Sequence, residues 1–389
     1  MSSLFYNYRH ILASNSWERH DFRNHWWRLY QDDPNWVPPF YSIFKKETRL
    51  SFNSHLARMD PIFYYSQAVL KRPPSQKSAP ASANSDNFYI SPFIEQTVST
   101  SIGLHNPKQT RLSAYLALVK VANDVEALER LIQVLGKELK TKGCRQIIAP
   151  TGLSPHLSSG ILLDCWDRLP PSHTAYNPPY IPDIFNAVMQ PYVTSRLYRM
   201  DLAGAYTPET GENKGEHPNI CFEPFEYNRL NADLSDLFQS AIPPESGFPF
   251  PDGDEIAFIL RSISNCPVIG QLALIEQQPV GFFLLQPDVS PVLHHCMGAK
   301  NIWWRPWLQW MVKRSARDGR LLFGGVEPEW RKKGVGHLLL MQAIMAAQKQ
   351  GWKSLYIGPV PERAEASSFL IHHGAKPEQT YQVYRLEIK

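Results

Sequence analysis

Two segments of the chain carry apolar residues at helical spacing. The first, residues 124–143, ends at Gly143, and the second, residues 336–350, is apolar on nearly every side and ends at Gly351. Four apolar residues define one face of the first helix: Leu128, Ile132, Leu135 and Leu139. Each helix is followed by a short strand-like stretch, IIAP in the first case and YIGP in the second. The pattern therefore predicts a helix and a strand at matching places in the two halves.

Strand-like stretches rich in β-branched and aromatic residues precede each helix. They span residues 61–70, 88–100 and 111–121 in the first half, and 271–278, 280–288 and 319–328 in the second. A second helix is expected at 362–376, after the last strand-like stretch. The repeated order indicates an internal duplication. Each half is predicted to be an α+β unit in which helices cover a twisted, mixed and mostly antiparallel sheet.

Two polar stretches interrupt this pattern. Residues 71–87 are rich in proline, serine, alanine and asparagine, and residues 203–218 have the same character near the middle of the chain. Such segments have no apolar period with which to pack. The second stretch marks the predicted domain boundary, which gives an N-terminal module at 1–202 and a C-terminal module at 203–389.

Composition and charge narrow the class of protein. The 389 residues are 43% hydrophobic and include 11 tryptophans, which is typical of a folded globular protein. Lys+Arg number 40 against 36 Asp+Glu, a formal charge of only +4. No global field favours nucleic acid or an acidic membrane, so neither is expected as a partner. Any anion would have to be bound locally.

The cysteines and histidines predict neither disulfides nor a metal site. The five cysteines are odd in number and contain no C-x-x-C, and the first residues lack the apolar run of a signal peptide. A cytoplasmic location is therefore expected. The histidine pairs at 294–295 and 372–373 lack the spacing of a metal-binding motif, so surface or capping roles are predicted for them.

A cationic, glycine-bearing turn stands immediately before the second apolar helix. The start of a helix presents unpaired N–H groups and the positive end of the helix dipole, and glycines let phosphate oxygens approach the main chain. The predicted anion-binding residues are Arg331, Lys332, Lys333, Gly334, Val335 and Gly336. The turn is neither a Walker loop nor a G-x-G-x-x-G motif. An ordinary solvated basic turn is the alternative. The first half has acidic Asp124 and Glu126 at the matching place, which would repel an anion.

The context of this turn resembles a known signature. V-x-P-x-x-R-x-x-G-x-G running into LLL is similar to the acetyl-CoA motif of the GCN5-related N-acetyltransferase (GNAT) superfamily. RLYQDDPNWVPP, YNPPYIPDIF and TYQVYRLEI extend the resemblance over the whole chain, to a bacterial group of tandem GNAT-like proteins. The resemblance implies two tandem GNAT-like modules, of which the first is degenerate and the second holds an acyl-CoA.

The resemblance also implies a reaction. Family members hold the pyrophosphate on the main chain of the turn, here 331–336, and pantetheine along the fourth strand, here 323–326. Backbone N–H groups near Val326 would then polarise the thioester carbonyl. The implied function is N-acyltransfer from acetyl-CoA, or another acyl-CoA, to a small-molecule or peptide amine bound in or near the cleft between the modules. The oligomeric state is left open.

The family's proton-transfer groups have no clear counterparts. The strand positions that often hold a glutamate base are 321–323, which are Leu, Leu and Phe, and the usual tyrosine acid maps onto Leu370. Glu327 is a weak candidate for the base, and Tyr356 or Tyr381 for the acid. A non-catalytic acyl-CoA-binding or interaction protein is therefore the main alternative function. An aminoacyl-tRNA donor would need a basic groove, which the charge balance does not favour.

Overall fold

The computed structural model describes residues 6–70, 96–106, 113–203, 220–225, 232–300, 303, 311–312 and 316–388. The first half contains β1 (Tyr6–Ala13), α1 (Ser16–Arg28), α2 (Tyr41–Glu47), α3 (Ser54–Arg58), β2 (Ile62–Leu70), β3 (Gln96–His105), β4 (Ser113–Val121), α4 (Val125–Thr141), β5 (Gln146–Thr151), β6 (Ile161–Leu162), α5 (Ile181–Val188) and β7 (Gln190–Asp201). The second half contains β8 (Cys221–Pro224), α6 (Ala232–Gln239), α7 (Gly253–Ile263), β9 (Ile269–Ile275), β10 (Gln278–Pro287), α8 (Ser290–His295), β11 (Asp318–Val326), α10 (Val335–Lys349), β12 (Ser354–Pro361), α11 (Glu365–His372) and β13 (Lys376–Glu387).

The predicted helices and strands are present at their expected places. The helices expected at 124–143, 336–350 and 362–376 are α4, α10 and α11. The start of the strand expected at 88–100 and the whole stretch 71–87 lie outside the described residues, as does nearly all of 203–218. The division into modules at 202 and 203 therefore stays a prediction.

The strands form one continuous sheet. Its order is β1-β2-β3-β4-β5-β13-β7-β12-β11-β10-β9-β8, with β6 paired to β13. In each half a run of antiparallel strands ends in one parallel pair, β4 with β5 and β11 with β12. The shared order of strands and helices confirms the duplication and the α+β class.

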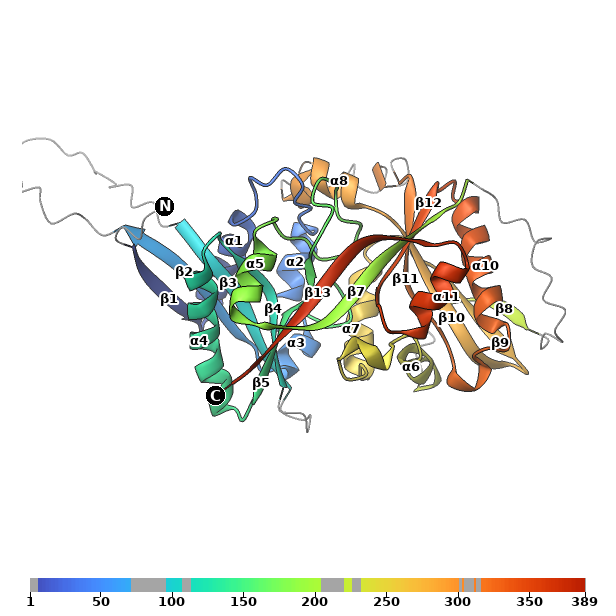
Figure 1. The fold of residues 1–389 in the computed structure, drawn as a ribbon, viewed down its shortest axis with the longest axis horizontal. Coiled ribbons are helices and arrows are strands. Elements are labelled where there is room, and N and C mark those ends of the chain that lie inside the picture. The colour runs from blue at the N-terminus through green and yellow to red at the C-terminus, as the bar shows by residue number, and fades with distance from the viewer. Residues whose placement is uncertain are drawn as a thin grey trace, which may run out of the picture.

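The two halves exchange their last strands. β13, from the C-terminal end, pairs with β5 through Tyr384 and Ala149, while β7, from the first half, pairs with β12 through Tyr198 and Ile357. β7 and β13 also pair with each other over most of their length and cross the centre of the molecule together (Figure 1). Each module's sheet is therefore completed by a strand of the other.

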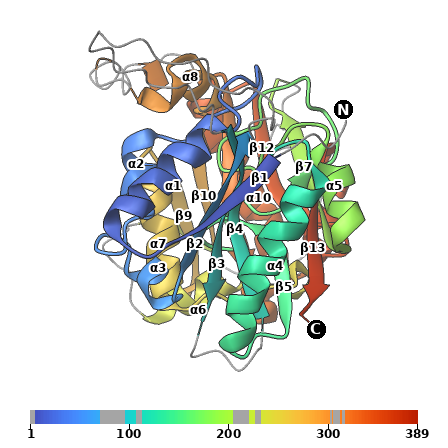
Figure 2. The same cartoon turned by 90° about the vertical axis from the view of Figure 1, so that its left-hand side faces the viewer.

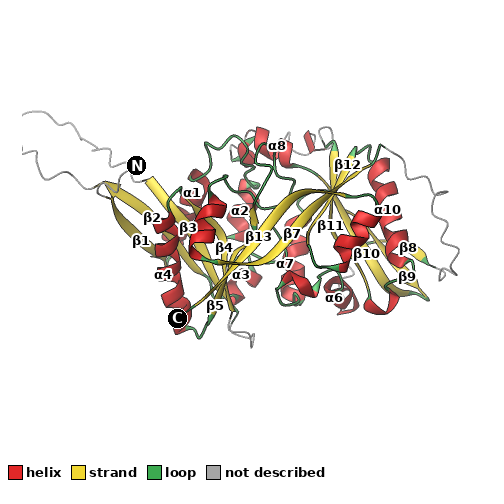
Figure 3. Ribbon diagram, in the orientation of Figure 1, coloured by secondary structure: helices red, strands yellow, loops and turns green. Residues whose placement is uncertain are grey.

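Alternation along the strands directs apolar side chains to both faces of the sheet. On β2, Phe63 and Tyr65 belong to a core cluster with α1, α2 and α3, whereas Tyr64 belongs to a cluster with α4 and α5. Figure 2 shows these two groups of helices on opposite sides of the strands. The first cluster continues through α6 and α7 into the second half, whereas α10 and α11 pack over a separate cluster (Figure 3). One apolar core therefore spans both halves.

Polar contacts add to this core where α7 of the second half meets the first half. Arg58 on α3 forms ion pairs with Asp252 (2.8 Å) and Asp254 (2.5 Å). The Ser154 hydroxyl, after β5, donates a 2.7 Å hydrogen bond to Glu255 on α7. Glu255 is only 7% exposed, and burial raises the pKa of its carboxyl to about 7.

Truncation of Tyr384 tests the strand exchange. Tyr384 lies on β13, in the second half of the sequence, but packs in the core of the first half. It is 1% exposed, and the centre of its ring lies 5.4 Å from that of Phe185 on α5. We expect Tyr384→Ala to lower the free energy of unfolding by about 3–5 kcal/mol, as for other large aromatic truncations. Glu387→Ala, at an exposed site on the same strand, should change it by less than about 0.5 kcal/mol. Equal effects of the two changes in urea unfolding would contradict the exchange.

Glu255 predicts a pH-dependent stability. Its pKa of about 7 in the folded protein lies above the usual 4.5, so the folded state binds more protons between these values. The free energy of unfolding contributed by Glu255 is therefore greatest below pH 4.5 and is lost as the pH rises through 7. Glu255→Gln should gain stability relative to the wild type by about 2 kcal/mol between pH 5 and pH 8. A pH-independent difference in urea unfolding would show that Glu255 titrates normally.

Candidate functional site

The glycine turn joins β11 to α10. A 3₁₀ turn at Pro328–Trp330 follows the strand, and α10 begins directly after Gly334, whose φ of 85° lies in the left-handed region that favours glycine. The helix leaves its first N–H groups without intrahelical acceptors, and no side chain caps them. At the matching helix of the first half, the Asp124 carboxylate accepts a hydrogen bond from the backbone N–H of Glu126. The two helix starts therefore differ as the sequence predicted.

The three cations of the turn are engaged with the protein itself. Arg331 donates to the carbonyl oxygens of Val326 (3.1 Å) and Ser240 (3.2 Å), which ties the turn to β11 and to the end of α6. Lys332 pairs with Glu365 at 3.1 Å, and Lys333 lies 4.6 Å from the centre of the Trp330 ring. The contact of Arg331 indicates that its first role is to shape the turn. The main-chain N–H of Arg331 donates to the carbonyl oxygen of Pro328 (3.3 Å), so the N–H groups at the start of α10 are the donors that remain open to an anion.

Gly336 is not required by packing. A Cβ atom placed there would meet Val326 and Phe369 only at 3.8 Å, an ordinary van der Waals distance. Gly325, by contrast, must be glycine, because a Cβ there would lie 2.6 Å from the backbone nitrogen of Ala241. The bare backbone at 336, on an uncapped helix start, fits a phosphate group that approaches the main chain closely. This is the observation that favours a phosphate-bearing cofactor at the turn.

The strands beside the turn diverge. β11 and β12 pair only from Asp318 with Ser354 to Leu321 with Ile357, although β11 continues to Val326. In the first half, β4 and β5 pair as far as Ala117 with Thr151. In both modules, the end of the fourth strand is therefore free of its parallel neighbour.

The candidate proton-transfer residues lie in different surroundings. Glu327 follows β11 and is half-buried, and burial together with Glu329 and Asp236 raises the pKa of its carboxyl. Tyr381 is 1% exposed, donates to the side-chain oxygen of Gln379 and packs in the core between β6 and β7. Leu370, on α11, is buried. Tyr381 is therefore enclosed in the core, and Glu327 stays a candidate.

One polar contact at the turn was not expected from the sequence. His337, in the first turn of α10, lies 2.9 Å from His373 at the end of α11, measured between Nδ1 and Nε2. The second ring nitrogen of His373 hydrogen-bonds the carbonyl oxygen of Phe369. The two histidines are 36 positions apart, so no local pattern could predict their contact. Among the described residues, no group of three or more potential metal ligands is present.

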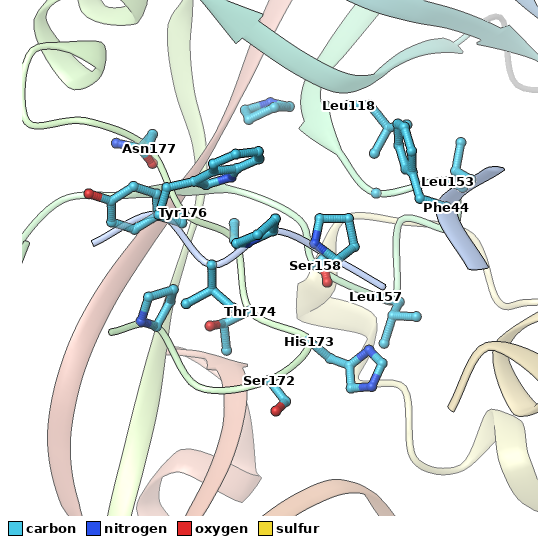
Figure 4. Close-up of a pocket in the computed structure, with 18 of the residues that line it drawn as sticks. Phe44, Leu118, Leu153, Leu157, Ser158, Ser172, His173, Thr174, Tyr176 and Asn177 are labelled. Atoms are coloured by element: carbon cyan, nitrogen blue, oxygen red, sulfur yellow. The ribbon is translucent and has the colours of Figure 1, made fainter. Parts of the chain in front are cut away.

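A cavity of about 270 Å³ lies where the two halves meet. Figure 4 shows Phe44, Leu118 and Leu153 on one side of it and Tyr176 and Asn177 on the other. Parts of α7 and α8 complete the wall from the second half. The proline-rich stretches 33–39 and 176–185 both contribute side chains to it. We name this space the inter-module cavity.

Comparisons with known proteins agree with this architecture. No protein-family model matches the sequence. Protein YghO of Escherichia coli (strain K12) is 20% identical over 387 residues, covering 92% of this chain and 90% of that protein. A tandem GNAT protein from the clavulanic acid biosynthesis pathway matches 99% of both chains at 9% identity, with a TM-score of 0.55.

A second solved structure gives the same result. It is a fungal multidomain GH3 β-N-acetylglucosaminidase with a GCN5-related glucosamine N-acetyltransferase region, at 12% identity and a TM-score of 0.58. The match covers 98% of this chain and 38% of that one. The chain therefore has the fold of tandem GNAT proteins, as the signature at the turn predicted. In the described part of the chain, no helix combines the length and apolarity needed to cross a bilayer.

Proposed function

We propose that the C-terminal module is an acyl-CoA-dependent N-acyltransferase with acetyl-CoA as donor. The observation that carries the proposal is the uncapped start of α10, where Gly336 leaves the backbone accessible although packing does not require a glycine. The tandem GNAT fold supports the same class of reaction. The N-terminal module, whose matching helix is capped by Asp124, does not take part in binding the donor.

Each part of the proposed site has a distinct role. The main-chain N–H groups of 332–336 bind the pyrophosphate, and Arg331 holds the turn in shape. Residues 323–326 of β11, beyond the last pair with β12, lie along the pantetheine. Bound acetyl-CoA would supply a thioester whose acyl group passes to an amine nitrogen, with release of the CoA thiol. Glu327 is the candidate to accept the proton of the amine.

The acceptor is proposed to be a small-molecule or peptide amine. The near-neutral charge of the chain provides no global field that would favour nucleic acid or acidic lipid. A cytoplasmic location, where acetyl-CoA is available, is part of the same proposal.

Donor binding is tested by Gly336→Asp. This change places a carboxylate at the proposed pyrophosphate site without steric overlap and at a helix start, where acidic residues are tolerated. At 100 times its dissociation constant, acetyl-CoA should stabilise the wild type by about 2.7 kcal/mol in thermal unfolding. The variant should show no stabilisation.

Gly253→Asp is the matched control for this experiment. Gly253 is the first residue of α7, and a Cβ there meets nothing within 4 Å. The Gly253→Asp variant makes the same chemical change at another helix start and should be stabilised by acetyl-CoA as much as the wild type. A folded wild type that acetyl-CoA does not stabilise, or a Gly336→Asp variant that responds like the wild type, would refute donor binding at the turn.

Turnover separates the enzyme from the alternative of a non-catalytic acyl-CoA-binding protein. We expect amine-dependent release of CoA thiol when acetyl-CoA is supplied with a panel of amino sugars, amino acids and peptides. Glu327→Gln should lower kcat by about 10²–10⁴-fold and leave acetyl-CoA affinity unchanged, whereas Glu329→Gln should retain activity. An unaltered kcat in Glu327→Gln would exclude it as the base. Tight binding without thiol release for any amine would favour the non-catalytic protein.

A further inference from the structure

The inter-module cavity contains a buried lysine. Lys120 lies near the end of β4, three residues beyond the last pair that β4 forms with β5, and is 7% exposed. Its Nζ lies 4.2 Å from the ring centre of Tyr30 and 5.2 Å from that of Trp26. All three residues line the cavity. The ammonium group is therefore removed from bulk water but faces an interior space.

Lys120 has no counter-ion within the described protein. Its one hydrogen bond there is to the carbonyl oxygen of Tyr176, at 3.2 Å, and it forms no ion pair with a carboxylate. The Asp33 carboxylate acts on the pKa of Lys120 without forming an ion pair with it. This carboxylate instead accepts hydrogen bonds from the Tyr176 hydroxyl (2.6 Å) and from the backbone N–H of Asn35. Burial lowers the pKa of Lys120 to about 7. The ammonium has three N–H donors, and a buried ammonium that forms no ion pair is costly, so its retention calls for an explanation.

A second polar group of the cavity lies on β5, the strand next to β4. The hydroxyl of Thr151, at the end of β5, is buried and finds no hydrogen-bond partner among the described residues, and Thr151 lines the same cavity. Lys120 and Thr151 therefore present polar atoms from both of the diverging strands. Buried polar groups in native proteins are almost always paired, so an unsatisfied hydroxyl beside an ammonium that forms no ion pair points to a missing anionic partner.

The other residues that line the cavity indicate the polarity and size of the rest of the ligand. They are mostly apolar and aromatic, with Trp26, Trp36, Phe44 and Phe185 among the lining residues. The volume is close to the lower end of the roughly 300–1,000 Å³ of small-molecule sites. Glu47 on α2 also lines the cavity, and burial raises the pKa of its carboxyl to about 6, which reduces its negative charge in mildly acidic solution.

We propose that the inter-module cavity binds a small organic acid, whose carboxylate pairs with Lys120 and accepts a hydrogen bond from Thr151 while its apolar body lies among the aromatic walls. A single lysine suits a singly charged carboxylate better than a phosphate, which is usually held by several donors or an arginine fork. The site is separate from the glycine turn and does not depend on the proposed transfer reaction. At this site, the diverging strands β4 and β5 of the N-terminal module bind a second ligand.

The proposal is tested by calorimetric titration at pH 6.0 with phenylacetate and hexanoate and with their uncharged amides, phenylacetamide and hexanamide. Lys120 is mostly protonated at this pH, given its pKa of about 7. Each acid should bind at least about tenfold more tightly than its amide, since a charged hydrogen bond in a buried site is worth about that much or more. Equal affinities, or no saturable binding of either acid, would overturn the proposal without any mutation.

Lys120→Met then assigns the effect to the lysine, because methionine retains an unbranched apolar stem among the aromatic rings. The acids should bind this variant no more tightly than the amides do. Lys46→Met, on the exposed side of α2 and outside the cavity lining, should bind the acids like the wild type. Undiminished binding to Lys120→Met would overturn the assignment. Stabilisation of Lys120→Met by acetyl-CoA, measured separately, distinguishes failure of this site from failure of the glycine turn.

Discussion

The exchange of β7 and β13 is the constraint on which the rest of the structure depends. Each is the last strand of its own half, and each completes the sheet of the other half through backbone hydrogen bonds. Backbone groups in a sheet interior must be paired, so neither module can close its sheet alone. The exchange joins both halves into one sheet and brings α7 and α8 against the first half. The inter-module cavity is lined by residues from both of the halves joined in this way.

The two modules use one scaffold for different local chemistry. In the second half the start of α10 is uncapped, and the strand before it carries Gly324, which is exposed, and Gly325, which packs against Ala241. In the first half Asp124 occupies the matching helix start, and the strand carries the side chain of Lys120. The same scaffold thus carries an uncapped helix start in one half and a buried lysine in the other. We interpret the degenerate module as a site for a different ligand and not only as a support.

Local patterns predicted the elements well because their causes are local. The face formed by Leu128, Leu135 and Leu139 requires a helix that buries it, and Gly143 and Gly351 mark where the two helices end. The glycine turn was also predictable, since the spacing of Arg331, Gly334 and Gly336 is itself the signal. Its cations, however, contact Val326, Ser240, Trp330 and Glu365, and only the folded chain shows that they shape the turn.

The sequence by itself determined the duplicated α+β order, the position of the turn and the contrast between the two helix starts. Only the tertiary structure decided which strand completes which sheet, because strand pairing between residues far apart leaves no periodic trace in either strand. The same reason applies to the contact of His337 with His373, and to Lys120, which looks like an ordinary strand lysine until residues 30 and 176 enclose it. Burial and charge pairing are properties of the assembled chain, so these features could not be obtained from local sequence patterns.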